Sequence, residues 1–464
     1  MTHSWRWFSV AYALLVFAPI VGVVLVTRFG ASLSPPLLDS ALRAAAPPPA
    51  NTTLRLPILL SQIVVIIVVS RLIAAIIRRL RQPQVVGEML AGLLLGPSVL
   101  GLLWPGVFAA VFPPGTLRFL NALSQIGLLL FMFLVGLELD PALLRERRHT
   151  ALLTSHASIA APMFAGSLLA LLLYKPLGAA GVPFLPFSLF LGAAMSVTAF
   201  PVLARILTEH RLQNTRLGTL SIACAAVDDV SAWCVLAVVV AIARDDATAM
   251  PLWATVGGAA LWVTFMLGVA RPAFGAIVRR FERHAELPHD LIAGVVVVIL
   301  ASAWVTERLG VHALFGAFIA GVSMPKNKVF VAGLVQRFED VMLVLLLPLF
   351  FAFTGLRTSV GLISGGSMWL LCLVVIGCAV VGKLGGSTVA ARVSGVPWRE
   401  SLSVGALMNT RGLMELVILN IGLDIGVITP TLFAMMVLMA VVTTMMTTPL
   451  LAALGATKGT ASTT

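Results

Sequence analysis

The chain has 464 residues, of which 59% are apolar and only 11% are charged. A charged fraction this far below the usual quarter, with a mean hydropathy of +1.03, excludes a water-soluble fold. The net charge of +12 comes from basic residues scattered at the ends of apolar runs, so it does not indicate nucleic-acid binding. We therefore interpret the chain as an all-α polytopic membrane protein that spans the lipid bilayer.

Apolar runs of about 20 residues, the length that a helix needs to cross the hydrocarbon core, recur along the whole chain. The runs are continuous and do not alternate with a period of two residues, so membrane-spanning strands are not expected. They predict fourteen transmembrane helices, at residues 8–26, 57–77, 85–103, 120–139, 150–173, 186–207, 217–243, 251–269, 291–305, 312–322, 341–355, 368–389, 402–422 and 431–454. The first run also fits a cleaved signal peptide, which would leave thirteen.

The positions of Lys and Arg predict the orientation of these helices. With the N-terminus inside, eighteen basic residues fall at cytoplasmic ends and eight at the opposite ends. Cytoplasmic loops retain positive charge during insertion, so this bias supports fourteen crossings. We expect a multi-pass protein of the inner cell membrane.

The two halves of the chain repeat the same short motifs in the same order. Residues 87–92 match 316–321, residues 130–137 match 349–356, and residues 192–196 match 405–409. Because one helix lies between the matching sets, equivalent helices cross the membrane in opposite directions, and the repeat is inverted. The predicted regions are an N-terminal helix or signal segment with an external linker (1–55), a first six-helix repeat (56–245), a linker helix and cytoplasmic loop (246–287), a second repeat (288–455) and a short tail (456–464).

Inverted repeats are typical of secondary transporters, in which discontinuous helices at matching positions form one site near the bilayer midplane. The sixth and thirteenth predicted helices occupy matching positions, and each contains a polar cluster with Pro or Gly. The first cluster contains Ser196 and Thr198, and the second contains Asn409, Thr410 and Arg411. We predict that both helices unwind at these clusters.

Asp228 and Asp229 lie near the middle of the seventh predicted helix. An ionised carboxylate at that depth costs at least about 2.5 to 3.5 kcal/mol, so the pair needs cations, protons or water. Two adjacent carboxyls are expected to titrate as a coupled pair, which suits proton exchange. With oxygen atoms of Ser196 and Thr198 they could also bind Na⁺ or K⁺, and competition between cation and proton for one carboxylate would couple the two flows.

Three further charges lie within predicted helices of the second half, namely Lys383, Arg411 and Glu415. Lys383 could pair with Asp228. Arg411 and Glu415 are four residues apart on one helix face, so they could neutralise each other or serve the site, and the sequence leaves both open.

The sequence resembles the monovalent cation:proton antiporter-2 family, which includes Kef-type potassium transporters, bacterial sodium/proton antiporters and plant cation/proton exchangers. The matching segments are 85–88 with 92 and 96–97, 133–138, 196–201, 226–229, 383 and 409–412. The resemblance implies crossed broken helices in a core domain, a separate domain that forms a homodimer, and elevator-like movement of the core.

The same resemblance assigns roles to individual residues. It implies that Asp229 binds the cation and the proton, that Asp228 pairs with Lys383 in the proton-loaded state, and that Arg411 balances the helix ends at the crossing. A paired Asp-Asp is associated with electrogenic exchange in such families. The chain ends at Thr464, so the cytosolic nucleotide-binding domain of Kef-type systems is not expected, and no cofactor is expected either.

These features favour an antiporter that exchanges Na⁺ or K⁺ for protons by alternating access. The alternative is a passive cation channel, for which the same acidic midplane would serve as a selectivity site. An intramembrane aspartyl enzyme needs carboxyls that face each other, whereas these are neighbours on one helix, so no enzyme activity is expected. The choice between Na⁺ and K⁺ stays open.

Overall fold

The computed structural model describes residues 9–36, 56–80, 82–138, 148–213, 215–243, 251–281 and 287–456. Over these ranges the chain is helical and contains no β-strand. The external linker beyond residue 36 and the tail beyond residue 456, both predicted from the sequence, lie outside the described residues. Among the described residues, twelve helices are long and apolar enough to cross a membrane, or thirteen if one bent pair counts as a single span. The tenth predicted segment, 312–322, forms a helix of only 11 residues.

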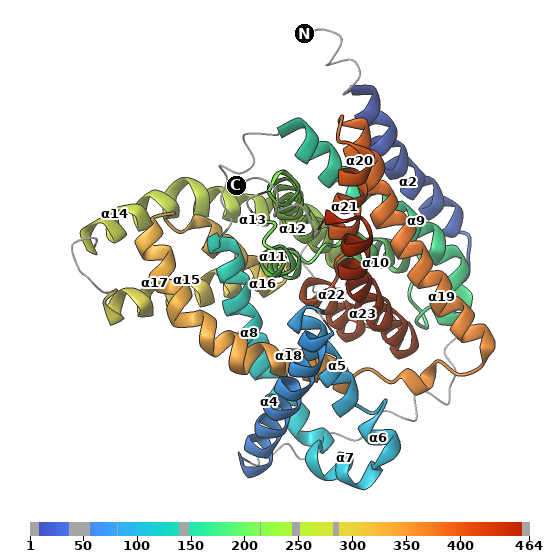
Figure 1. The fold of residues 1–464 in the computed structure, drawn as a ribbon, viewed down its shortest axis with the longest axis horizontal. Coiled ribbons are helices and arrows are strands. Elements are labelled where there is room, and N and C mark those ends of the chain that lie inside the picture. Colours follow the sequence, from blue (N-terminus) through green and yellow to red (C-terminus); the bar gives the residue numbers. More distant parts are fainter. Residues whose placement is uncertain are drawn as a thin grey trace.

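One group of helices forms what we call the scaffold bundle, at the left and bottom of Figure 1. Its members are α4 (Leu56–Arg79), α5 (Gln84–Leu95), α8 (Leu117–Glu138), α15 (His289–Arg308), α16 (Ala313–Ser323), α17 (Lys328–Val341) and, after a π-helical turn η4 (Met342–Leu346), α18 (Leu347–Leu356). Two short helices, α6 (Leu100–Leu103) and α7 (Pro105–Val111), and a 3₁₀ turn η2 (Pro114–Thr116) connect α5 to α8.

The second group forms the core bundle, at the centre and right of Figure 1. Its members are α9 (Arg148–Leu177), α10 (Phe184–Ser196), α11 (Phe200–Glu209), α12 (Arg216–Ala243), α19 (Gly366–Val380), α20 (Gly386–Val393), α21 (Trp398–Met408), α22 (Leu413–Asp424) and α23 (Pro430–Ala453). A π-helical turn, η6 (Val381–Gly385), joins α19 to α20, and a 3₁₀ turn, η5 (Val360–Leu362), precedes α19.

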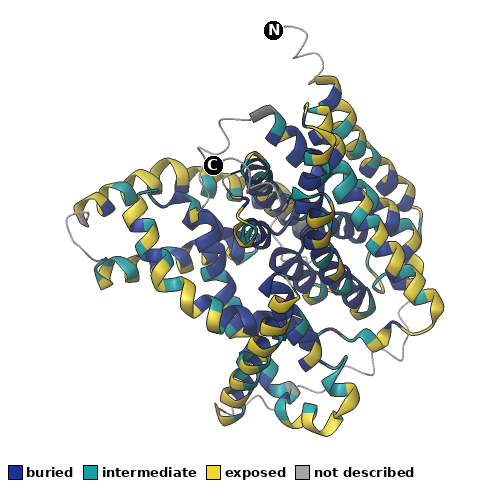
Figure 2. Cartoon of the chain, in the orientation of Figure 1, coloured by how far each residue is buried: buried dark blue, intermediate teal, exposed yellow. Residues whose placement is uncertain are grey.

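Two further segments complete the fold. The N-terminal helix, a π-helical turn η1 (Ala13–Phe17) followed by α2 (Ala18–Gly30), packs on α9 and α10 of the core bundle. The linker helix consists of α13 (Leu252–Phe265), a π-helical turn η3 (Met266–Ala270) and α14 (Arg271–Phe281). Exposed apolar side chains line the outer helices, including α2, α4 and α15, as expected for surfaces that face lipid (Figure 2).

The scaffold bundle shows the inverted repeat directly in its packing. Helix α5 packs on α18, and the equivalent helix of the second repeat, α16, packs on α8. Glycines make both approaches possible, because a Cβ at Gly92 would lie 2.2 Å from the Phe351 carbonyl oxygen and one at Gly321 would lie 2.1 Å from that of Phe133. Each repeat therefore supplies one partner to each contact, which supports the predicted architecture.

Candidate ion-binding site at the helix crossing

Two interrupted helices meet at the centre of the core bundle. Between α10 and α11 the chain is extended at Val197 and Ala199, and α21 and α22 are separated by residues 409–412 with a bend of 43°. The Ala199 amide donates to the Thr410 carbonyl oxygen at 3.0 Å, which joins the two breaks. The predicted unwinding of both helices is thus confirmed.

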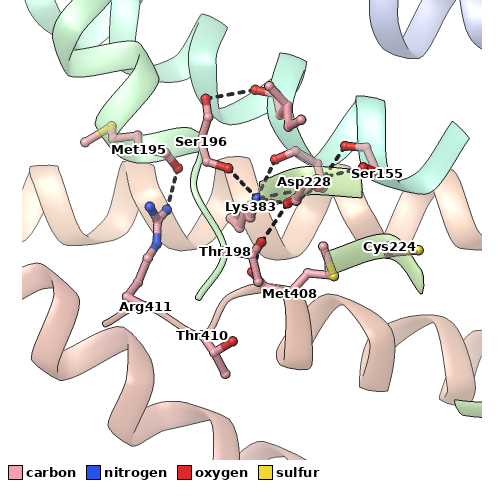
Figure 3. Close-up of polar contacts among 12 residues, drawn as sticks. Ser155, Met195, Ser196, Thr198, Cys224, Asp228, Lys383, Met408, Thr410 and Arg411 are labelled. Carbon is pink, nitrogen blue, oxygen red and sulfur yellow. Dashed lines mark hydrogen bonds and ion pairs between the residues drawn. The ribbon is translucent and has the colours of Figure 1, made fainter. Parts of the chain in front are cut away.

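Asp228, on α12, is fully buried beside this crossing and has a complete set of partners (Figure 3). One carboxylate oxygen, Oδ1, accepts from the Ser155 hydroxyl at 2.9 Å and lies 2.7 Å from the Ser158 hydroxyl. The other, Oδ2, accepts from the Thr198 hydroxyl at 2.7 Å and from the Lys383 ammonium at 2.7 Å. Three hydroxyls and one ammonium therefore hold this carboxylate.

Lys383 reaches Asp228 from the π-helical turn η6, and π-helical turns of this kind are frequent at functional sites. Its ammonium has three hydrogens to donate. Besides Asp228 it contacts the Ser158 carbonyl oxygen at 2.9 Å and the Ser196 carbonyl oxygen. The lysine is fully buried, so contacts with protein groups must replace the hydration that its charge has lost.

Asp229 differs sharply from its neighbour. Its side chain is only 1% exposed, yet neither carboxyl oxygen has a hydrogen-bond partner within the described parts of the chain. The backbone of Phe200, at the beginning of α11, interacts with it, and the charges of Asp228 and Lys383 also act on it. A helix N-terminus favours negative charge, but an uncompensated buried carboxylate is costly. Asp229 is therefore the group at the crossing that needs a proton or a cation.

Arg411 caps the end of α10. Its guanidinium donates to the carbonyl oxygens of Ala194 at 3.0 Å and Met195 at 2.5 Å (Figure 3). Glu415 lies 3.7 Å from the same guanidinium, and its carboxyl oxygens lack hydrogen-bond partners among the residues that the structure describes. Both side chains are buried. The arginine thus contacts the helix break as well as the carboxylate.

The remaining predicted residues differ in how they face the site. The Ser196 hydroxyl points away from the carboxylates and donates to the Gly192 carbonyl oxygen at 2.7 Å, so Ser196 contributes its carbonyl and not its hydroxyl. The Thr410 hydroxyl donates to the Leu407 carbonyl oxygen at 2.8 Å. The side-chain amide of Asn409 is buried at the break, without a hydrogen-bond partner in the described ranges. Outside the site, Glu88 accepts from Gln84 at 3.2 Å.

Sequence reasoning missed Ser155 and Ser158, which contact Asp228 from α9. Serine is common in transmembrane helices, so neither residue stands out by itself. The available signal was their spacing, because residues three apart lie on one helix face.

Comparison with known proteins agrees with this geometry. Residues 64–454 match the family described as "Sodium/hydrogen exchanger, transmembrane". The chain is 44% identical to the Na⁺/H⁺ antiporter NhaS4 of Synechocystis over 82% of its own length and 93% of that protein. It is 42% identical to cation/H⁺ antiporter 17 of Arabidopsis thaliana and 33% identical to K⁺/H⁺ antiporter 1 of Saccharomyces cerevisiae, over 83% and 80% of its own length.

The match spans about half of those plant and yeast relatives, at 47% and 43% of their lengths. Among solved structures, the sodium proton antiporter MjNhaP1 of Methanocaldococcus jannaschii superposes with a TM-score of 0.64, covering 87% of this chain and 98% of that one, at 16% identity. That likeness supports the same fold. The chain belongs to the sodium/hydrogen exchanger family of integral membrane cation/proton antiporters.

Proposed function

We propose that this protein exchanges Na⁺ or K⁺ for protons across the cell membrane, with Asp229 as the carboxylate that cation and proton share. The observation that carries the proposal is the contrast within one pair of neighbours. Asp228 has four protein partners, whereas the Asp229 carboxyl is buried without a hydrogen-bond partner among the described residues. Oxygen atoms of Thr198 and of the backbone at the breaks would complete the coordination of a monovalent cation.

Charge accounting supports competition as the coupling mechanism. Lys383 forms an ion pair with Asp228, and Arg411 lies beside Glu415, so Asp229 is the carboxylate at the crossing that has no ion pair among the described residues. Carrying an ionised, empty Asp229 through the membrane would add the cost of a buried charge. The site therefore moves when Asp229 holds a proton or a cation. Binding of the cation displaces the proton, and binding of the proton displaces the cation.

The same accounting separates electrogenic from electroneutral exchange. When Asp229 and Lys383 both carry protons, the three groups Asp228, Asp229 and Lys383 sum to zero charge. If a monovalent cation displaces both protons, the sum including the cation becomes −1. If Lys383 keeps its proton, the sum stays at zero and exchange is electroneutral. We assign the second proton to Lys383, so transport responds to membrane potential.

Movement of the core bundle against the scaffold bundle would give alternating access. The helices pack mainly within their own bundle. Two polar links between the bundles are partly exposed, since Arg357 after α18 contacts Asp424 at 2.6 Å and Arg205 of α11 contacts Gln84 at 2.5 Å. A third is buried, where the Asn420 side chain donates to the Thr354 hydroxyl at 2.9 Å. Such links can break and re-form without disturbing the buried ion site. The homodimer that the resemblance implies stays a prediction.

Reconstituted liposomes with an imposed pH gradient and a lumenal pH dye test the proposal. We expect Na⁺ or K⁺, but not choline, to move protons in the wild type. Asp229→Asn should abolish this movement, while Glu209→Gln, which changes a carboxylate half exposed at the end of α11, should leave it intact. Cation current without proton movement would refute antiport and favour the channel.

A further inference from the structure

Helix α9 contains a proline at a position that matters for the site. Pro162 lies inside the helix, and proline has no backbone N–H. In a regular helix the amide of residue 162 would donate to the carbonyl of residue 158. Pro162 therefore releases the Ser158 carbonyl from its helical partner, and this is the carbonyl oxygen that accepts from Lys383 at 2.9 Å.

The second backbone acceptor of Lys383 arises in a similar way. Ser196 is the last residue of α10, where helix carbonyls lack intrahelical donors. The ammonium thus donates to one carboxylate and to two carbonyls that a proline and a helix end set free, and the Ser158 hydroxyl lies farther away, at 3.4 Å. Since an ammonium has three hydrogens, each of the three is matched.

Lys383 also approaches α9 directly at the proline. A Cβ at the adjacent Gly382 would lie 2.9 Å from the Pro162 Cα, so η6 rests against this part of α9. Both helices depart from regular α-helix where they touch, one through proline and the other through the π-helical turn. This contact fixes the position of the Lys383 ammonium along α9, next to the Ser158 carbonyl.

We propose that Pro162 is a positioning residue that keeps the Ser158 carbonyl available to Lys383 and so sets the pH range over which the antiporter works. The inference rests on the proposed function, in which Lys383 carries the second proton. With proline at position 162 the protonated lysine keeps all three acceptors. An N–H at this position would compete for one of them, and Lys383 would release its proton at lower pH.

Pro162→Ala and Pro162→Gly both restore this N–H, and Pro176→Ala restores an N–H near the C-terminal end of the same helix. We expect the half-maximal pH of antiport to move acid by about one unit in both Pro162 variants, because one hydrogen bond to a charged group is weakened. Pro176→Ala should keep the wild-type profile. Thermal stability of Pro162→Ala should equal or exceed that of the wild type, since alanine suits a helix interior.

The pH midpoint of cation-induced thermal stabilisation in detergent gives the same readout if a variant no longer transports. If the wild type shows antiport and both Pro162 variants keep the wild-type pH midpoint, the inference about Pro162 is overturned and the proposed function stands. An equal shift in Pro176→Ala would also overturn it, because the effect would then follow helix stiffness. Absence of antiport in the wild type would instead refute the proposed function.

Discussion

Arg411 is expected to stabilise the core bundle mainly as a cap on α10 and only secondarily as the partner of Glu415. Its guanidinium makes two charged hydrogen bonds, to Ala194 and Met195, whereas Glu415 is 3.7 Å away without a hydrogen bond. Charged hydrogen bonds contribute about 1.5 to 3 kcal/mol each in soluble proteins, and polar pairs in membranes about 0.6 to 1.7 kcal/mol. We therefore expect Arg411→Met to lower the free energy of unfolding by about 2 to 4 kcal/mol, and Glu415→Gln by about 1 kcal/mol or less.

Reversible unfolding of the purified protein in mixed micelles would measure both losses. The double variant Arg411→Met with Glu415→Gln should be more stable than Arg411→Met alone, because the single variant leaves a buried carboxylate without its cation. Equal losses for the two single variants would refute the reasoning, since the ion pair and not the cap would then dominate. Arg411→Lys should recover only part of the stability, because an ammonium lacks the planar fork that reaches two carbonyls.

Two further predictions concern packing and the contact between the bundles. Gly355→Ala should destabilise the scaffold bundle by about 3 kcal/mol or more, because the new Cβ would lie 2.0 Å from the Gly92 carbonyl carbon. Thermal melts should show no such loss for the control Gly377→Ala, because nothing lies within 4 Å of a Cβ at that position. Arg357→Gln removes the 2.6 Å link to Asp424, which is about half exposed. An ion pair of this kind contributes about 1 kcal/mol or less, so the rate of amide hydrogen exchange at the end of α22 should rise up to about fivefold. An unchanged exchange rate would argue against a link between the bundles.

The sequence was most informative where polar chemistry interrupts an apolar background. Asp228, Asp229 and Lys383 stand out because charges within membrane helices are expensive and need a reason. Both helix breaks were predictable because polar clusters with Pro or Gly recur at equivalent places of the inverted repeat. The structure brings these residues to one crossing, as their positions in the repeat indicated.

Helix boundaries were predicted less well, for a physical reason. The predicted helix at 341–355 begins in the structure at Lys328, and the one at 251–269 continues to Phe281. Both extensions contain charged residues, which end an apolar run but do not end an amphipathic helix. Hydropathy therefore marks the membrane-buried part of a helix and misses the part beyond it.

The hydroxyls of Ser155 and Ser158 and the free carbonyl at Ser158 were harder to foresee. Their role depends on which face of α9 meets α12, and on a hydrogen bond that Pro162 removes. A sequence shows that a proline is present, but the partner that takes the released carbonyl comes from a helix more than 200 residues away. Such long-range pairing follows from tertiary structure alone.

The two breaks are equivalent in fold but differ in charge, and this difference supports the proposed ion site beside the carboxylates of the first repeat. The end of α10 receives two cations, since Arg411 binds the Ala194 and Met195 carbonyls and Lys383 binds that of Ser196. Among the described residues the end of α21 receives neutral donors, because hydroxyls of Thr410 and Thr198 reach the carbonyls of Leu407 and Met408. Positive charge supplied by the second repeat therefore collects beside the carboxylates of the first. A carboxylate placed at the end of α21 would meet no such cation among the described residues, so the fold can repeat while the proposed ion site lies on one side of the pseudo-twofold axis.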